Sequence, residues 1–198
     1  MQLTKIALLA AASLAMAACN QQRDAASNEA AADAKPVAAT DHKDPAASAM
    51  AAAPASIARA ATIVTANPDG SMTTVREGSN GWTCMPDNPI TPGPDPMCMD
   101  GNAAKWAAAW IGKKEPPANT VGIMYMLEGG TDASNVDPYA KGPTEGNAWI
   151  ETGPHIMVVG SKEALAGYPS GPKPDTSAPY VMWADTPYAH LMIPVDKS

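Results

Sequence analysis

The segment GPHIMVVG, residues 153–160, decides the fold, because it has the pattern of a strand with two different faces. Side chains alternate along a strand, so His155 and Met157 would share one face while Ile156 and Val158 take the other. We therefore expect a sheet with one Met- and His-bearing side.

The same alternation recurs in three other segments. YAHLMIPV, residues 188–195, places a His and a Met two residues apart, while TVGIMYML, residues 120–127, and YVMW, residues 180–183, set Met opposite other apolar residues. If the four segments are strands of one sheet with aligned faces, five Met and two His share one side. These residues are His155, His190, Met124, Met126, Met157, Met182 and Met192.

Two interpretations of that face remain open. Thioether sulfur with imidazole is the donor set that soft Cu(I) prefers, so the seven residues are candidate copper ligands. Met is also an adaptable filler of hydrophobic cores, and a chain of 198 residues with 12 Met and no Phe needs such a filler. Under the second interpretation the protein has no cofactor.

The chain is acidic, with 13 Lys and Arg against 20 Asp and Glu and a formal net charge of −7. Binding to a nucleic-acid backbone needs clustered cations that displace counterions, so nucleic acid is not an expected partner. The length suits one domain with appendages, and no apolar run reaches the ~18 residues of a membrane-spanning helix.

Residues 1–18 have the build of a secretory signal peptide, because a Lys precedes an apolar run that ends in small residues. The ending MAAC resembles the lipobox of bacterial lipoproteins, although that family usually has Leu where this chain has Met16. The resemblance implies that Cys19 is the first mature residue and carries acyl chains such as palmitate, which anchor the protein in a membrane. The alternative is ordinary cleavage after Ala17, which would release a soluble protein.

Asn20 follows the Cys, as in the outer-membrane sorting pattern of Gram-negative lipoproteins. The resemblance therefore implies an outer-membrane anchor with the domain in the periplasm.

Residues 19–61 are rich in Ala, Ser, Asp and Pro and contain no aromatic residue. Such a segment cannot bury enough apolar surface to offset the ordering of its backbone, so we expect a disordered tether after the lipidated Cys. All ten Trp and Tyr lie from Trp82 onward. We therefore predict a single globular domain over residues 62–198.

The domain is expected to be α+β, with a small mixed or antiparallel sheet, one main Trp-bearing helix and many loops. An Asp-Gly turn at 69–70 predicts a hairpin that opens the domain. Asp100 would cap a helix that runs to about Lys114, with two Trp and Ile111 on its buried face. Residues 81–100 hold five Pro and predict an irregular loop without ladder hydrogen bonds.

Cys84 and Cys98 lie 14 residues apart in this Pro-rich stretch. An exported protein meets an oxidising compartment, and Cys19 is committed to the lipid, so we expect the remaining two to form a disulfide. The alternative, a thiolate nucleophile or metal pair, needs an activating partner that the sequence does not display.

The sequence lacks the marker motifs of common enzymes, among them G-x-S-x-G, H-E-x-x-H and the Walker loop. The leading hypothesis is a membrane-anchored binding or structural module whose protein or small-molecule ligand is unknown. One alternative is a periplasmic Cu(I)-binding protein that uses the Met and His face. The other is an enzyme in which His155 and His190 act with an acid.

The stretches GWTCMPDNP, DPMCMD, GGTDASNVDP, TGPHIMVV and PYVMWADTPYAHLMIPV together resemble a family of uncharacterised exported bacterial proteins. The resemblance covers about residues 80–195. It supports the predicted domain boundary and implies no catalytic residue.

Overall fold

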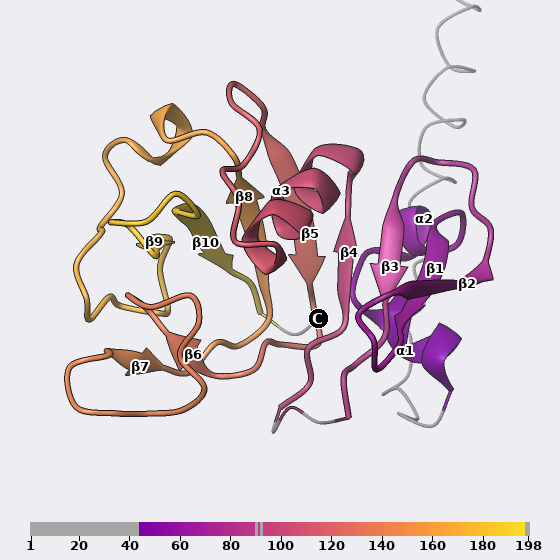
Figure 1. The fold of residues 1–198 in the computed structure, drawn as a ribbon, viewed down its shortest axis with the longest axis horizontal. Coiled ribbons are helices and arrows are strands. Elements are labelled where there is room, and N and C mark those ends of the chain that lie inside the picture. Colours follow the sequence, from indigo (N-terminus) through magenta and orange to yellow (C-terminus); the bar gives the residue numbers. More distant parts are fainter. Residues whose placement is uncertain (1–43, 90, 92, 197–198) are drawn as a thin grey trace, which may run out of the picture. The chain divides into compact units, whose positions relative to one another are not determined.

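The computed structural model describes residues 44–196 apart from positions 90 and 92, and it has the α+β, loop-rich fold that the sequence predicts (Figure 1). The helices are α1 (Pro45–Ala51), α2 (Ala55–Ala58), α3 (Gly101–Ile111) and the 3-10 helix η1 (Glu163–Leu165). The strands are β1 (Thr62–Ala66), β2 (Met72–Arg76), β3 (Thr83–Met85), β4 (Met97–Met99), β5 (Gly122–Met126), β6 (Ala133–Ser134), β7 (Trp149–Ile150), β8 (His155–Val159), β9 (Tyr180–Met182) and β10 (His190–Pro194).

Eight of these strands form one sheet in the order β2-β1-β3-β4-β5-β8-β10-β9, and β6 pairs with β7 separately. Strands β1 and β3 run parallel, whereas the other neighbours in the large sheet are antiparallel. The predicted opening hairpin is β1–β2. The four segments predicted to carry the Met and His residues are β5, β8, β10 and β9, and they lie next to one another.

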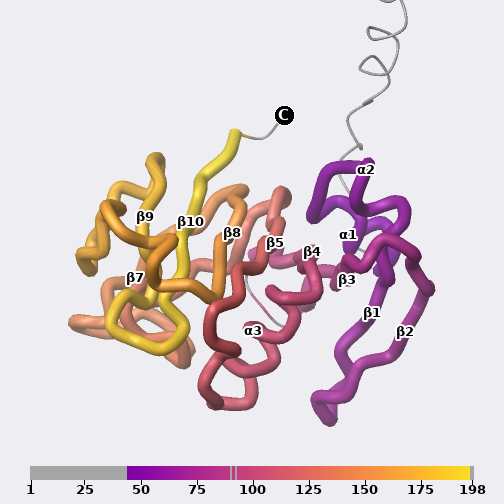
Figure 2. The backbone as a smooth tube through the Cα atoms, turned by 90° about the horizontal axis from the view of Figure 1, so that it is seen from above, coloured from indigo at the N-terminus to yellow at the C-terminus, as the bar shows by residue number. Residues whose placement is uncertain are grey.

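Helix α3 lies on one side of the sheet, and α1 and α2 lie on the other (Figure 2). Asp100 caps α3 as predicted, because its Oδ1 accepts hydrogen bonds from the backbone N–H groups of Asn102 at 3.0 Å and Ala103 at 2.7 Å. Its Oδ2 accepts from the N–H of Ile123 in β5 at 3.0 Å. One carboxylate therefore caps the helix and fastens it to the sheet.

The prediction that the two Trp and Ile111 lie on the buried face of α3 is confirmed for the two Trp and is wrong for Ile111. Trp106 is buried and Trp110 packs at the margin of the same core cluster. Ile111 is 66% exposed. The helix ends at Ile111 rather than near Lys114, so this side chain stands in the last turn, beyond the stripe that packs on the sheet.

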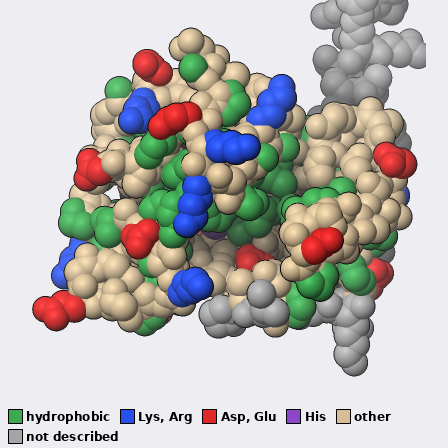
Figure 3. All heavy atoms as spheres, viewed as in Figure 1, with side chains coloured by type: hydrophobic (Ala, Val, Ile, Leu, Met, Phe, Trp, Pro, Cys, Tyr) green, Lys and Arg blue, Asp and Glu red, His purple; other side chains and the backbone are tan. Residues whose placement is uncertain are grey.

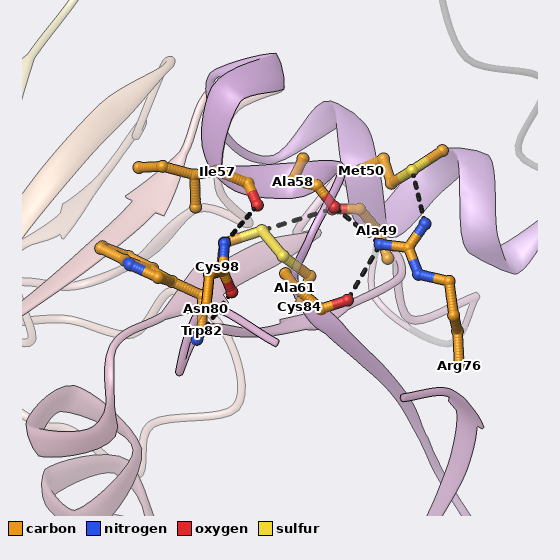
Figure 4. The surroundings of a disulfide bond; sticks show 10 residues. All are labelled: Ala49, Met50, Ile57, Ala58, Ala61, Arg76, Asn80, Trp82, Cys84 and Cys98. Atoms are coloured by element: carbon orange, nitrogen blue, oxygen red, sulfur yellow. Dashed lines mark hydrogen bonds between the residues drawn. A yellow bond between two sulfur atoms is a disulfide. The ribbon is translucent and has the colours of Figure 1, made fainter. Parts of the chain in front are cut away.

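The folded part begins earlier than the predicted boundary at residue 62, because α1 and α2 pack on the sheet. Ala49, Ala52 and Ala53 are buried in one cluster with the disulfide. The guanidinium of Arg76 donates to the carbonyls of Ala58 at 2.7 Å and Ala61 at 2.9 Å (Figure 4). Small Ala side chains thus give a close-packed layer, which composition alone does not reveal. The rest of the predicted tether, residues 19–43, lies outside the described residues.

Cys84 and Cys98 form the predicted disulfide and are completely buried (Figure 4). They also face each other across β3 and β4, so the prediction of a loop without ladder bonds is wrong for these two segments. Pro86 and Pro96 stand immediately outside the strands, which leaves each three-residue strand free of Pro and able to pair. Among the described residues, no helix is long and apolar enough to cross a membrane.

Candidate functional site

The seven candidate residues share one face of the sheet, as the alternation predicted. Directly opposed residues of antiparallel strands point to the same side. The opposed sets are Met124–Met157–Met192, Met126–His155 and His190–Met182. This is the side that α3 covers, because the Met side chains pack with Trp106 of that helix. On the molecular surface, hydrophobic side chains gather in the middle of the view with charged side chains of both signs around them (Figure 3).

The two imidazoles lie in different rows of that face. His155 is opposed on β10 by Pro194, four residues beyond His190 on the same strand. Four residues span roughly 13 Å along a strand. The two imidazoles therefore have different surroundings, although the charge on His155 still contributes to lowering the pKa of His190.

His190 belongs to an aromatic cluster. Its ring packs edge-on to Trp183 at 4.9 Å and Trp106 at 5.3 Å between centroids. Its Nδ1 donates to the carbonyl of Tyr188 at 2.9 Å, since a carbonyl can only accept. Burial lowers the pKa of His190 to about 4. His190 is therefore a neutral side chain of the core.

Trp183 holds an unusual backbone conformation beside His190. Its φ is 55°, in the left-handed region that a bulky residue rarely adopts. Its indole N–H donates to the carbonyl of Ser134 at 2.8 Å. Its backbone N–H donates to the carbonyl of Asn135 at 2.9 Å. Ser134 and Asn135 thus hold in place the indole ring of Trp183, which packs against His190.

His155 has a different surrounding, at the rim of a cavity. It is 4% exposed, and its Nδ1 donates to the carbonyl of Gly153 at 2.7 Å. A Cβ on Gly130 would lie 2.9 Å from His155 Cε1, so the glycine permits a close approach of backbone to the ring. Burial lowers the pKa of His155 below its ordinary value. The imidazole is held neutral, with its proton on Nδ1 and the lone pair on Nε2.

The cavity beside His155 has a volume of about 180 Å³. Its lining comes from the loop before β8, the segment before β9, and the ends of β9 and β10: Glu151, Thr152, Gly153, Pro154, His155, Thr176, Tyr180, Met192, Pro194 and Val195. Burial raises the pKa of Tyr180 to about 12, so its hydroxyl stays protonated at neutral pH. A neutral imidazole and a neutral phenol therefore border the same small space.

Sequence reasoning missed Tyr180 and Thr176 as site residues. The first could have been found, because Tyr180 stands two residues before Met182 and the same alternation puts it on the Met and His face. Thr176 lies in a loop with no periodic pattern. Of the predicted ligands, the cavity gathers only His155 and Met192.

Within the described part of the chain, no three His, Cys, Asp or Glu side chains come together as a metal site. All five predicted Met ligands are core residues: Met124, Met126, Met157, Met182 and Met192 lie with Trp106 in one buried cluster. Cys19, the predicted lipidation site, lies outside the described residues.

No protein-family model, curated protein or solved structure matches this chain.

Proposed function

We propose that the protein is an exported lipoprotein whose folded domain binds a small organic ligand in the His155 cavity, as a binding module rather than a catalyst. The observation that carries the proposal is the pairing of a neutral, oriented imidazole with a protonated phenol around one cavity of about 180 Å³. Small-molecule sites commonly combine apolar walls with a few placed polar groups.

The lining defines the class of ligand. A cavity of ~150 Å³ holds a molecule the size of benzene, so the ligand would have about seven non-hydrogen atoms. Met192 and Pro194 supply apolar wall, His155 Nε2 supplies an acceptor, and the Tyr180 hydroxyl supplies a donor. Among the described residues, Glu151 is the charged one in the lining. A neutral or cationic ligand with one donor and one acceptor fits this set.

The proposal of export and anchoring has two supports. The N-terminal sequence has the order of charge, apolar run and small residues before Cys19 that lipoproteins share. The buried disulfide suits an oxidising compartment such as the periplasm. Anchoring through acyl chains would hold the binding domain beside the membrane, where a small solute crosses or is captured.

The ligand proposal is tested by a fragment screen on the full chain, read by protein NMR. We expect weak binders that shift resonances of the cavity residues, and a loss of at least tenfold in their affinity in Tyr180→Phe, which removes only the hydroxyl. Tyr168→Phe is the matched control, because Tyr168 is 42% exposed and outside the cavity. Absence of any cavity binder, or equal effects of the two substitutions, would refute the proposal.

Anchoring is tested separately by mass spectrometry of the protein isolated from its native cells. A diacyl or triacyl modification on Cys19 and recovery in the membrane fraction are expected, and Cys19→Ser should lose both. An unmodified mature N-terminus in the soluble fraction would contradict the anchor and leave the ligand proposal standing.

A further inference from the structure

We infer that the sheet carries a Cu(I) site in a row of four side chains, Met85, Met97, Met126 and His155, which we call the thioether row. It lies on β3, β4, β5 and β8, four neighbouring strands of the sheet. The site goes beyond the proposed organic ligand, and because both would use the lone pair on His155 Nε2, Cu(I) and that ligand would exclude each other. Two of its members, Met85 and Met97, are absent from the set that the sequence predicted.

The register of the sheet brings the four residues into line. Met85 opposes Met97 across β3 and β4, and Met126 opposes His155 across β5 and β8. Met99 opposes Met124 between β4 and β5, so continuing that antiparallel register by two residues sets Met97 beside Met126. All four side chains therefore project from one face in consecutive strands.

The spacing suits a single soft ion. Opposed Cβ atoms on neighbouring strands are about 5 Å apart. Met126 occupies the middle, with Met97 on one side and His155 on the other, so three donors lie within the reach of one ion above β5. The Met side chains have three rotatable bonds and adapt readily. Met85 is the next residue along the row and can supply a fourth donor.

Only the outer half of the row differs in exposure from the Met residues beside it, because Met126 and His155 are 7% and 4% exposed and are as buried as those residues. Met99 and Met124, one step along the same strands, are 6% and 3% exposed and pack with Trp106 of α3. Met85 and Met97 are only half-buried. An ion can therefore approach the thioether row from the Met85 end, while the covered row acts as hydrophobic core.

His155 has the orientation of a metal ligand before any metal binds. Metal-binding imidazoles usually donate their second ring N–H to a carbonyl or carboxylate, which fixes the ring and the tautomer. His155 Nδ1 makes this bond to Gly153 O at 2.7 Å. The free lone pair is then on Nε2. On the β5 side the opposed residue is Met126, and on the β10 side it is Pro194, which has no donor group in its side chain.

The donor set selects the ion. Thioethers favour soft Cu(I), whereas Zn²⁺ in proteins is held by Cys, His and carboxylates. No cluster of those hard and borderline ligands occurs among residues 44–196 outside positions 90 and 92. We expect one Cu(I) per chain and no stoichiometric Zn²⁺.

The test is a competition titration of the full chain with Cu(I) and a chromophoric chelator under anaerobic, reducing conditions. Met97→Leu and Met126→Leu keep side-chain volume and remove sulfur. Each should weaken Cu(I) binding at least tenfold. The controls are Met99→Leu and Met124→Leu, one row along on the same strands, which should change affinity less than twofold.

X-ray absorption at the copper edge gives a second readout. Two or three sulfur scatterers and one nitrogen are expected, and His155→Gln should remove the nitrogen. If one Cu(I) does not bind, or if the control row weakens binding as much as the thioether row, the inference is wrong. Either result leaves the fragment experiment at Tyr180 unaffected, so failure of this site is distinguishable from failure of the proposed function.

Discussion

Lowering the pH from 7 to 5 should destabilise the protein through His190. The unfolded imidazole has a pKa of about 6.5, whereas burial lowers the folded value to about 4. Between those values the unfolded state binds the proton and the folded state does not, so stability is present above pH 6.5 and is lost as the pH falls. From pH 7 to 5 these two pKa values give a loss of roughly 2 kcal/mol.

The assay is urea unfolding of wild-type protein and His190→Asn at both pH values. Asn can keep a donor near the carbonyl of Tyr188 but does not titrate. The variant should therefore be less stable than the wild-type protein at pH 7, and its free energy of unfolding should fall by roughly 2 kcal/mol less than that of the wild type between pH 7 and 5. Ionisable groups that do not interact with His190 are common to both proteins and cancel in the difference, whereas His155 contributes a smaller part because its charge also lowers the pKa of His190. Equal pH dependence in the two proteins would refute a buried neutral His190.

Three further experiments test the fold. Reduction of the Cys84–Cys98 disulfide should lower the free energy of unfolding by about 3 kcal/mol, because it releases the closure entropy of a loop of about 15 residues. The measurement is thermal unfolding with and without a reducing agent, in which Tm should fall by several degrees. An unchanged Tm would contradict this expectation. Gly122→Ala should cost about 2 kcal/mol or more in urea unfolding, because its Cβ would lie 2.3 Å from the backbone of α3. Gly142→Ala, with nothing within 4 Å, is the control that should be nearly neutral. Asp100→Ala should cost about 2 kcal/mol and Asp100→Asn much less, since Asn retains a capping oxygen; equal losses would argue against the cap.

Alternation along strands was enough to predict the shared Met and His face. His155 and Met157 had to point the same way in any strand, and antiparallel neighbours then aligned them with Met124 and Met126. The disulfide could also be predicted, because the number of Cys residues and the expectation of export together favoured the pairing of Cys84 with Cys98. Both predictions use information that can be read directly from the sequence, without knowledge of which segments pack together in the fold.

Contacts between distant segments were beyond the sequence. The packing of α1 against the sheet depends on how closely Ala49 approaches the disulfide, where Cys98 Sγ lies 3.5 Å from the Ala49 carbonyl oxygen. The thioether row depends on β3 and β4 pairing inside a stretch whose Pro content predicted a loop. The cavity depends on a loop that brings Thr176 to His155, and no periodic pattern marks such a position.

The neutral, Nδ1-protonated state of His155 underlies both the ligand cavity and the thioether row. Long-range ¹H–¹⁵N correlation spectra of the imidazoles, recorded on the full chain at pH 7, measure this state directly. We expect a protonated Nδ1, a Nε2 with the chemical shift of an unprotonated nitrogen, and titration below pH 6.5. A proton on Nε2, or a charged imidazolium at pH 7, would contradict this prediction.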